Sequence, residues 1–109
     1  MNTAVRSRLN RAGWRVGTAE AFLKLSREEA QLVEIKLALG DSLKRNRARR
    51  RLTQGALAAR LGSSQSRIAK AEAGVGGVTL DLLFRALLAT GLEAGDIARE
   101  MLRRPRPAA

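Results

Sequence analysis

The sequence has no cysteine and no histidine among its 109 residues, and aromatic side chains make up only 3% of it. A thiolate nucleophile, an imidazole base and a zinc-finger site are therefore excluded, and so are disulfide bonds. The lack of disulfides fits a reducing compartment, and we expect the protein to be cytoplasmic. Since no nucleophile–base pair and no metal-ligand cluster remains, we expect no enzyme activity, no catalytic residue, no metal and no cofactor.

Long apolar runs are also missing from the sequence. None would span a bilayer, and the basic start of the chain lacks the apolar core of a signal peptide, so we expect no membrane segment. Apolar residues nevertheless make up 45% of the sequence, which is enough for a folded core. Leu and Ala dominate them and β-branched residues are few. Because this balance favours helices over strands, the composition predicts an all-α protein.

Acidic residues are scarce, 10 against 21 basic ones, which gives a formal net charge of +11. Such a charge implies a polyanionic partner, either nucleic acid or an anionic membrane surface. No acidic residue lies between Asp41 and Glu72. The nine basic residues of that segment are Lys44, Arg45, Arg47, Arg49, Arg50, Arg51, Arg60, Arg67 and Lys70. For the run over 44–51 the sequence leaves two interpretations open, a solvated helix face or a set of phosphate contacts.

A long helix is predicted to begin after Ser26. The side chains of Ser26 and Glu29 are spaced to cap each other's backbone amides, which is the capping-box pattern. The helix should run to about residue 50, with a buried stripe at helical spacing. The stripe consists of Leu32, Ile35, Leu39 and Leu43. Gly40 is expected to weaken the middle of this helix, because glycine is a poor helix former.

Four shorter helices are predicted to follow, and capping residues precede or end the first three of them. Their expected ranges are 54–61 after Thr53, 65 to 72 or 73 after Ser64, 80 to about 90 between Thr79 and Gly91, and roughly 94–102. We expect three parts in the chain. Residues 1–31 form an arm with a short helix, residues 32–102 form the helical domain, and residues 103–109 form a basic tail.

The segment 53–74 contains the most informative pattern, two short helices joined by a tight turn. Gly62 permits the left-handed backbone that the turn needs. Leu57, Leu61 and Ile68 are spaced to face inward, and Ala58 is small where the two helices would touch. These features agree with one another, and they predict a helix-turn-helix.

The second helix of this pair would then present a polar face to solvent. Gln65, Ser66 and Lys70 lie on it, and short polar residues at a helix N-terminus suit insertion into the DNA major groove. Gln65 can bond adenine bidentately, and Lys70 can reach guanine acceptors. We expect these three residues to contact bases. Residues placed to contact the DNA backbone are Gln54, Ser63, Ser64, Arg67 and Arg50.

The segment resembles the helix-turn-helix of the lambda-repressor-like, XRE family, and the resemblance extends over about 32–101. It implies a five-helix DNA-binding domain that binds operator DNA as a homodimer, with one recognition helix per subunit. It also implies an ion pair between an arginine of the first helix and a glutamate that ends the recognition helix. Arg47 and Glu72 match these positions. The sequence departs from the family at Ala73 and in the 74–78 loop, which lacks basic residues.

Outside this segment, small XRE proteins assigned as HigA-like antitoxins are resembled by Gly13-Trp14-Arg15-Val16-Gly17 and the following Ala21-Phe22-Leu23 and Leu25-Ser26. That resemblance implies a repressor that regulates its own operon and neutralises a RelE/HigB-type ribonuclease toxin. Two alternatives stay open. One is a stand-alone or prophage XRE regulator without a toxin partner. The other is an RNA-binding or anionic-surface protein that uses charge alone.

Overall fold

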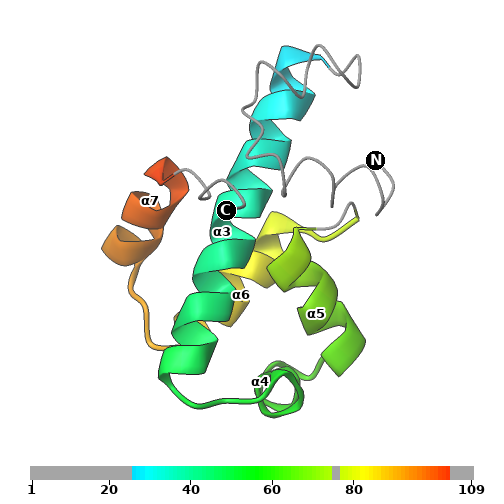
Figure 1. The fold of residues 1–109 in the computed structure, drawn as a ribbon, viewed down its shortest axis with the longest axis vertical. Helices are drawn as coiled ribbons and strands as arrows, with labels where there is room; N and C mark the ends of the chain where they lie inside the picture. The colour runs from blue at the N-terminus through cyan, green and yellow to red at the C-terminus, as the bar shows by residue number, and fades with distance from the viewer. Residues whose placement is uncertain (1–25, 75–76, 104–109) are drawn as a thin grey trace, which may run out of the picture.

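Five helices follow one another along the described residues, which are 26–74 and 77–103 in the computed structural model (Figure 1). Their bounds are α3 (Arg27–Arg49), α4 (Gln54–Leu61), α5 (Gln65–Ala73), α6 (Leu80–Ala89) and α7 (Ala94–Leu102). No strand occurs in these two ranges, so the all-α prediction is confirmed. Of these helices, none is long and apolar enough to cross a membrane. The short helix predicted within 1–31 and most of the basic tail lie outside the described residues.

Polar side chains define where the helices begin, as the sequence predicts. The hydroxyl oxygen of Ser26 accepts from the Glu29 amide at 3.1 Å, and the Glu29 carboxylate accepts from the Ser26 amide at 3.4 Å. The hydroxyls of Thr53, Ser64 and Thr79 each accept from the backbone amide three residues on, at 3.0–3.2 Å. Each bond satisfies an amide that has no partner within its helix. The predicted caps are therefore confirmed.

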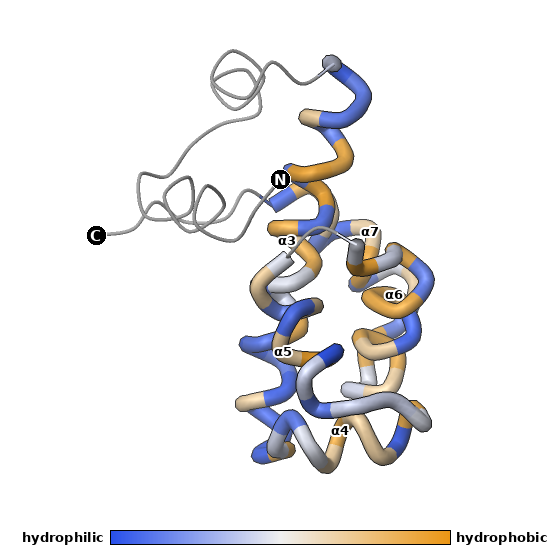
Figure 2. The backbone as a smooth tube through the Cα atoms, turned by 90° about the vertical axis from the view of Figure 1, so that its right-hand side faces the viewer, coloured by the Kyte–Doolittle hydropathy of each residue, from blue (hydrophilic) through white to orange (hydrophobic). Residues whose placement is uncertain are grey.

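Helix α3 runs along the molecule and packs against α5, α6 and α7. The fully buried core consists mainly of leucines from these elements and α4: Leu39, Leu43, Leu57, Ile68, Leu83 and Leu87. The predicted stripe is wrong at its start, because Leu32 is 39% exposed. The first turns of α3 extend beyond the other described helices (Figures 1 and 2). Helical spacing identifies the apolar face of a helix, but it does not show how far along the helix its neighbours reach.

Gly40 has a packing role that the sequence did not indicate. It is buried where α5 crosses α3, and a Cβ added there would lie 2.5 Å from the carbonyl oxygen of Ala71 and 2.8 Å from that of Glu72. Any side chain would therefore push the end of α5 away. Gly40 permits the close approach of the two helices, and this approach brings the end of α5 next to α3.

The turn between α4 and α5 has the predicted geometry. Gly62 has φ 63° and ψ 35°, which is the left-handed conformation. The amides of Gly62 and Ser63 donate to the carbonyls of Ala59 and Ala58, at 3.3 and 2.9 Å, and so satisfy the end of α4. Ala58 itself is 3% exposed at this crossing. The two helices are thereby held at a fixed angle by a short connection.

Candidate nucleic-acid interface

One face of α5 is turned to solvent and the opposite face is part of the core. Ile68 and Ala71 are fully buried, whereas Gln65, Ser66 and Lys70 are exposed. The three residues expected to contact bases therefore share one accessible face. Arg67 is exposed at its flank. The arrangement leaves short polar groups at the N-terminal end of α5, where the helix dipole is positive.

A buried carboxylate connects this helix to α3. The side chain of Glu72 is 4% exposed, and it pairs with Arg47, whose side chain is 16% exposed. The Arg47 Nε and Nη2 both donate to Glu72, the second at 3.2 Å, and Arg47 Nη1 donates to the carbonyl of Leu52 at 2.8 Å. The hydrogen bonds to Glu72 raise the pKa of Arg47, so the guanidinium stays charged. The ion pair implied by the family resemblance is present.

The same carboxylate is linked to the exposed face through Gln54. The Nε2 of Gln54 donates to Glu72 Oε1 at 3.0 Å, and the Oε1 of Gln54 accepts from Gln65 Nε2 at 3.4 Å. A chain of side chains thus leads from Arg47 in α3 to Gln65 at the start of α5. The sequence led us to expect Gln54 on the DNA backbone but gave no sign of this link, because Gln54 lies 11 positions from Gln65 and 18 from Glu72.

Two of the expected backbone contacts do not fit the structure. The Ser63 hydroxyl oxygen is buried without a hydrogen-bond partner, and its amide already donates to Ala58. Ser63 therefore presents no donor to solvent. Arg50 is exposed, but its guanidinium lies directly against Gly91, in the loop between α6 and α7. Gly91 belongs to the loop that leads into α7, so this contact puts Arg50 by the α7 side. Helices α7 and α5 lie on opposite sides of α3 (Figure 1).

Ser64 fits a backbone contact better than Ser63 does. Its hydroxyl is exposed and accepts from the amide of Arg67 at 3.2 Å. A hydroxyl that accepts in this way keeps its own proton for a further acceptor. Ser64 therefore caps α5 and can also donate to a group that approaches the start of this helix.

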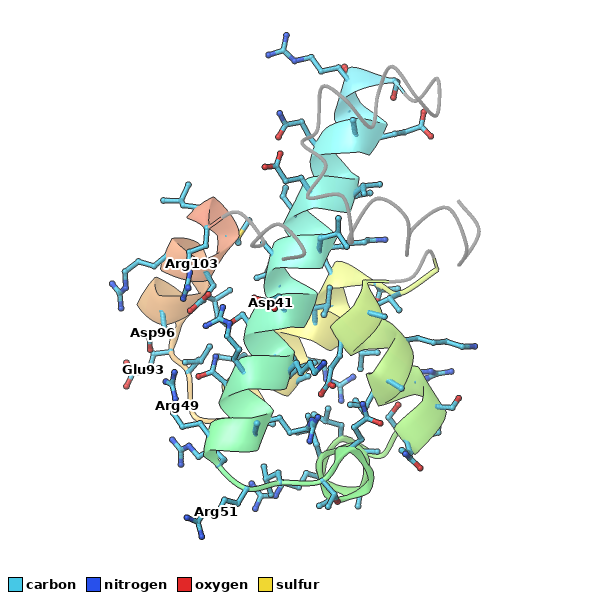
Figure 3. The ribbon with its side chains drawn as sticks, in the orientation of Figure 1. Asp41, Arg49, Arg51, Glu93, Asp96 and Arg103 are labelled. Carbon is cyan, nitrogen blue, oxygen red and sulfur yellow. The ribbon has the colours of Figure 1, made fainter. Side chains whose placement is uncertain are left out.

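The basic residues of the run over 44–51 point to different parts of the molecule. Arg45 joins α3 to α7, because its Nε lies 3.0 Å from Asp41 Oδ2 and its Nη2 lies 3.1 Å from Glu100 Oε2. Burial is the largest single influence on the pKa of Arg45 and lowers it, but the two carboxylates together outweigh burial and raise the pKa. Figure 3 shows Arg49 on the side of Glu93 and Asp96, while Arg51 lies at the end of α3. Arg45 and Arg49 are thus engaged within α3 or with α7, whereas Arg47 pairs with Glu72 of α5.

Comparison with known families agrees with this architecture. A family model described as helix-turn-helix matches residues 43–97, which include α4 and α5 and the turn between them. Among curated proteins and among solved structures, no match was found. The family match covers just over half of the chain. The chain therefore belongs to the XRE-type helix-turn-helix family, has its lambda-repressor-like all-helical fold, and is a DNA-binding transcription regulator.

Proposed function

We propose that the protein is a sequence-specific repressor that reads operator DNA with the exposed face of α5. The observation that carries this proposal is the chain Arg47–Glu72–Gln54–Gln65, which links the exposed Gln65 side chain to a buried ion pair. A side chain held in this way loses little freedom when it binds. Gln65 can then bond both edge groups of one adenine, while Ser66 and Lys70 contact neighbouring bases.

The proposed backbone contacts surround this face. Ser64 and Arg67 at the start of α5 are placed to donate to phosphate oxygens. Gln54 uses one hydrogen of its amide nitrogen on Glu72, and the nitrogen carries a second. Gln54 therefore has two roles in this proposal, since it positions Gln65 and contacts a phosphate.

Two copies of the chain would bind one operator. A single α5 reads too few bases for a specific site, and a two-fold dimer doubles the number of bases read. The two recognition helices would enter successive major grooves about 34 Å apart on one face of the DNA. Occupation of a promoter in this way blocks transcription.

A gel-shift experiment tests sequence specificity. The full chain is titrated against its native upstream region and against a scrambled duplex of the same length and composition, at physiological salt. Specific binding predicts an affinity difference of about 10³-fold or more. Equal affinity for both duplexes would reject sequence-specific binding and support a protein that binds anionic surfaces by charge alone.

We further propose that the regulator is the antitoxin of a type II pair, with a RelE/HigB-type ribonuclease as partner and its own operon as target. The support is the resemblance of the Gly13–Ser26 segment to HigA-like proteins. The test is co-expression with the product of the adjacent gene. Co-purification and relief of growth arrest support the pair. An adjacent gene that encodes no small ribonuclease leaves the alternative, a stand-alone or prophage regulator.

A further inference from the structure

A basic hollow of about 510 Å³ lies between α5 and α6. Arg67 and Lys70 line it from α5, and Arg85 lines it from α6. The acidic side chain in its lining is Asp81, on the first turn of α6. Arg85 has no evident role in the sequence, because it stands alone in an apolar helix and outside the helix-turn-helix. Only the fold brings it next to the flank of α5.

The position of this hollow relative to the exposed face is informative. The exposed face of α5 lies between two features. On one side Gln54 of α4 accepts a hydrogen bond from Gln65, and on the other side Arg67 lines the hollow. A helix in the major groove, which is about 12 Å wide, lies between two sugar–phosphate backbones. Gln54 and Ser64 are placed to contact one of these backbones, and the hollow is placed to contact the other.

The charges in the hollow are available to a ligand. Arg85 Nη1 lies 3.9 Å from Asp81 Oδ2, and the two side chains are 57% and 80% exposed. An exposed pair at this distance is weak, and water competes for it. Arg67 and Lys70 are also exposed. Three cations against one anion leave an excess of positive charge, and the positive end of the α6 dipole adds to it.

The size of the hollow favours a segment of polynucleotide over a small ion. Its volume of about 510 Å³ is far larger than the roughly 10–15 Å³ that a single water molecule needs. The side chain of Leu82 contributes apolar surface beside the cations. A sugar ring next to a phosphate is complementary to this lining, because it places a less polar body beside an anion.

We propose that this hollow binds the DNA backbone on the α6 side of the major groove, and that Arg85 together with Arg67 holds a phosphate there. The inference rests on the proposed function, because it assumes that α5 occupies the groove. Lys70 belongs both to the exposed face of α5 and to the lining of the hollow. Asp81 opposes the phosphate.

The experiment compares Arg85→Gln with a matched control, Arg99→Gln. Arg99 is an exposed arginine that also pairs with an acidic residue of its own helix, but it lies on α7, away from α5. Affinities for the native upstream duplex and the scrambled duplex are measured from 50 to 200 mM salt. Loss of one phosphate contact lowers the salt slope by about 0.9, so the loss of affinity over this range becomes about 3.5-fold smaller.

We expect Arg85→Gln to weaken binding to both duplexes by the same factor and to lower the slope, while Arg99→Gln matches the wild-type protein. Arg85→Lys should keep the slope, and Asp81→Asn should strengthen binding to both duplexes. The inference is overturned if Arg85→Gln keeps the wild-type slope, or if it weakens the native duplex alone. Failure of the proposed function has a different signature, since the wild-type protein would then bind both duplexes equally.

Discussion

The side-chain amide of Gln54 donates a hydrogen bond to Glu72 at 3.0 Å, and so joins the first turn of α4 to the last turn of α5. Glu72 in turn pairs with Arg47 of α3, and Gln54 accepts from Gln65. The carboxylate is therefore the common point of three helices. Variants of these four residues should separate effects on stability from effects on DNA recognition.

Arg47→Met should destabilise the protein strongly. It leaves the Glu72 carboxylate, 4% exposed, without its cation, and such a loss costs about 3–5 kcal/mol. Urea unfolding measures the effect. The control is Arg85→Gln, which removes an exposed pair and should change stability by less than about 1 kcal/mol. Adding Glu72→Leu to Arg47→Met should recover much of the stability, because no buried charge is then left unpaired. Equal stability of Arg47→Met and the wild-type protein would contradict this account.

Gln54 and Gln65 should be energetically coupled in DNA binding. If Gln54 positions Gln65, removing Gln54 also weakens the contact that Gln65 makes with DNA. The losses of binding free energy in the two single variants then do not add up to the loss in the double variant. A double-mutant cycle with Gln54→Ala and Gln65→Ala on the native duplex should give a coupling of roughly 0.5–3 kcal/mol. Gln54→Ala with Lys70→Ala is the matched pair without a shared contact, and it should be additive within about 0.5 kcal/mol. Additivity in both cycles would remove Gln54 from its positioning role.

Two glycines in helices should respond to alanine with opposite signs. Gly40→Ala places a methyl group against the carbonyls of Ala71 and Glu72, and overpacking of this kind costs about 1–3 kcal/mol. Gly55→Ala lies on the exposed side of α4, with its nearest atom 3.9 Å away, and should stabilise by about 0.5–1 kcal/mol. Thermal unfolding of both variants checks the pair. Stabilisation by Gly40→Ala would show that α3 and α5 do not approach as described.

The start of α7 should become less stable in acid. The Asp96 carboxylate accepts hydrogen bonds from the Glu93 amide, at 2.9 Å, and from the Arg99 guanidinium. Both bonds lower the pKa of Asp96 below its ordinary value of 3.8, and the bond from the Glu93 amide has the larger effect. Because the folded pKa is the lower one, the stabilisation is complete above the unfolded pKa and is lost as pH falls through the folded pKa. The difference in melting temperature between the wild-type protein and Asp96→Asn should therefore be constant above about pH 5 and shrink below pH 4. A difference that is unchanged down to pH 2 would be inconsistent with these contacts.

Local features of the fold were predictable from the sequence, and features that depend on distant packing were not. Ser26 and Gly62 act on residues within a few positions of themselves, so their spacing is sufficient to predict a helix start and a turn. The packing role of Gly40 and the burial of the Ser63 hydroxyl could not be predicted, because they depend on a neighbouring helix and on the depth of a turn. Arg50 was assigned to DNA from its place in a basic run, whereas the packing of α6 and α7 decides where it lies.

The candidate site likewise has features that the sequence predicted and features that only the structure revealed. Helical periodicity placed Gln65, Ser66 and Lys70 on one exposed face, since that face is fixed by the buried positions of the same helix. The family resemblance supplied the pairing of Arg47 with Glu72. The connection through Gln54 and the proximity of Arg85 to α5 required the three-dimensional arrangement, because each joins helices that are separate in the sequence.

The central claim is that the exposed face of α5 reads base sequence, and one ratio tests it most directly. This ratio is the affinity for the native upstream duplex divided by that for the scrambled duplex, measured at physiological salt for the wild-type protein and for Gln65→Ala. The account predicts a ratio of about 10³ or more for the wild-type protein. It predicts a ratio about 5- to 150-fold lower for the variant, which corresponds to a loss of roughly 1–3 kcal/mol. A ratio near one for the wild-type protein, or the same ratio for both proteins, would contradict it.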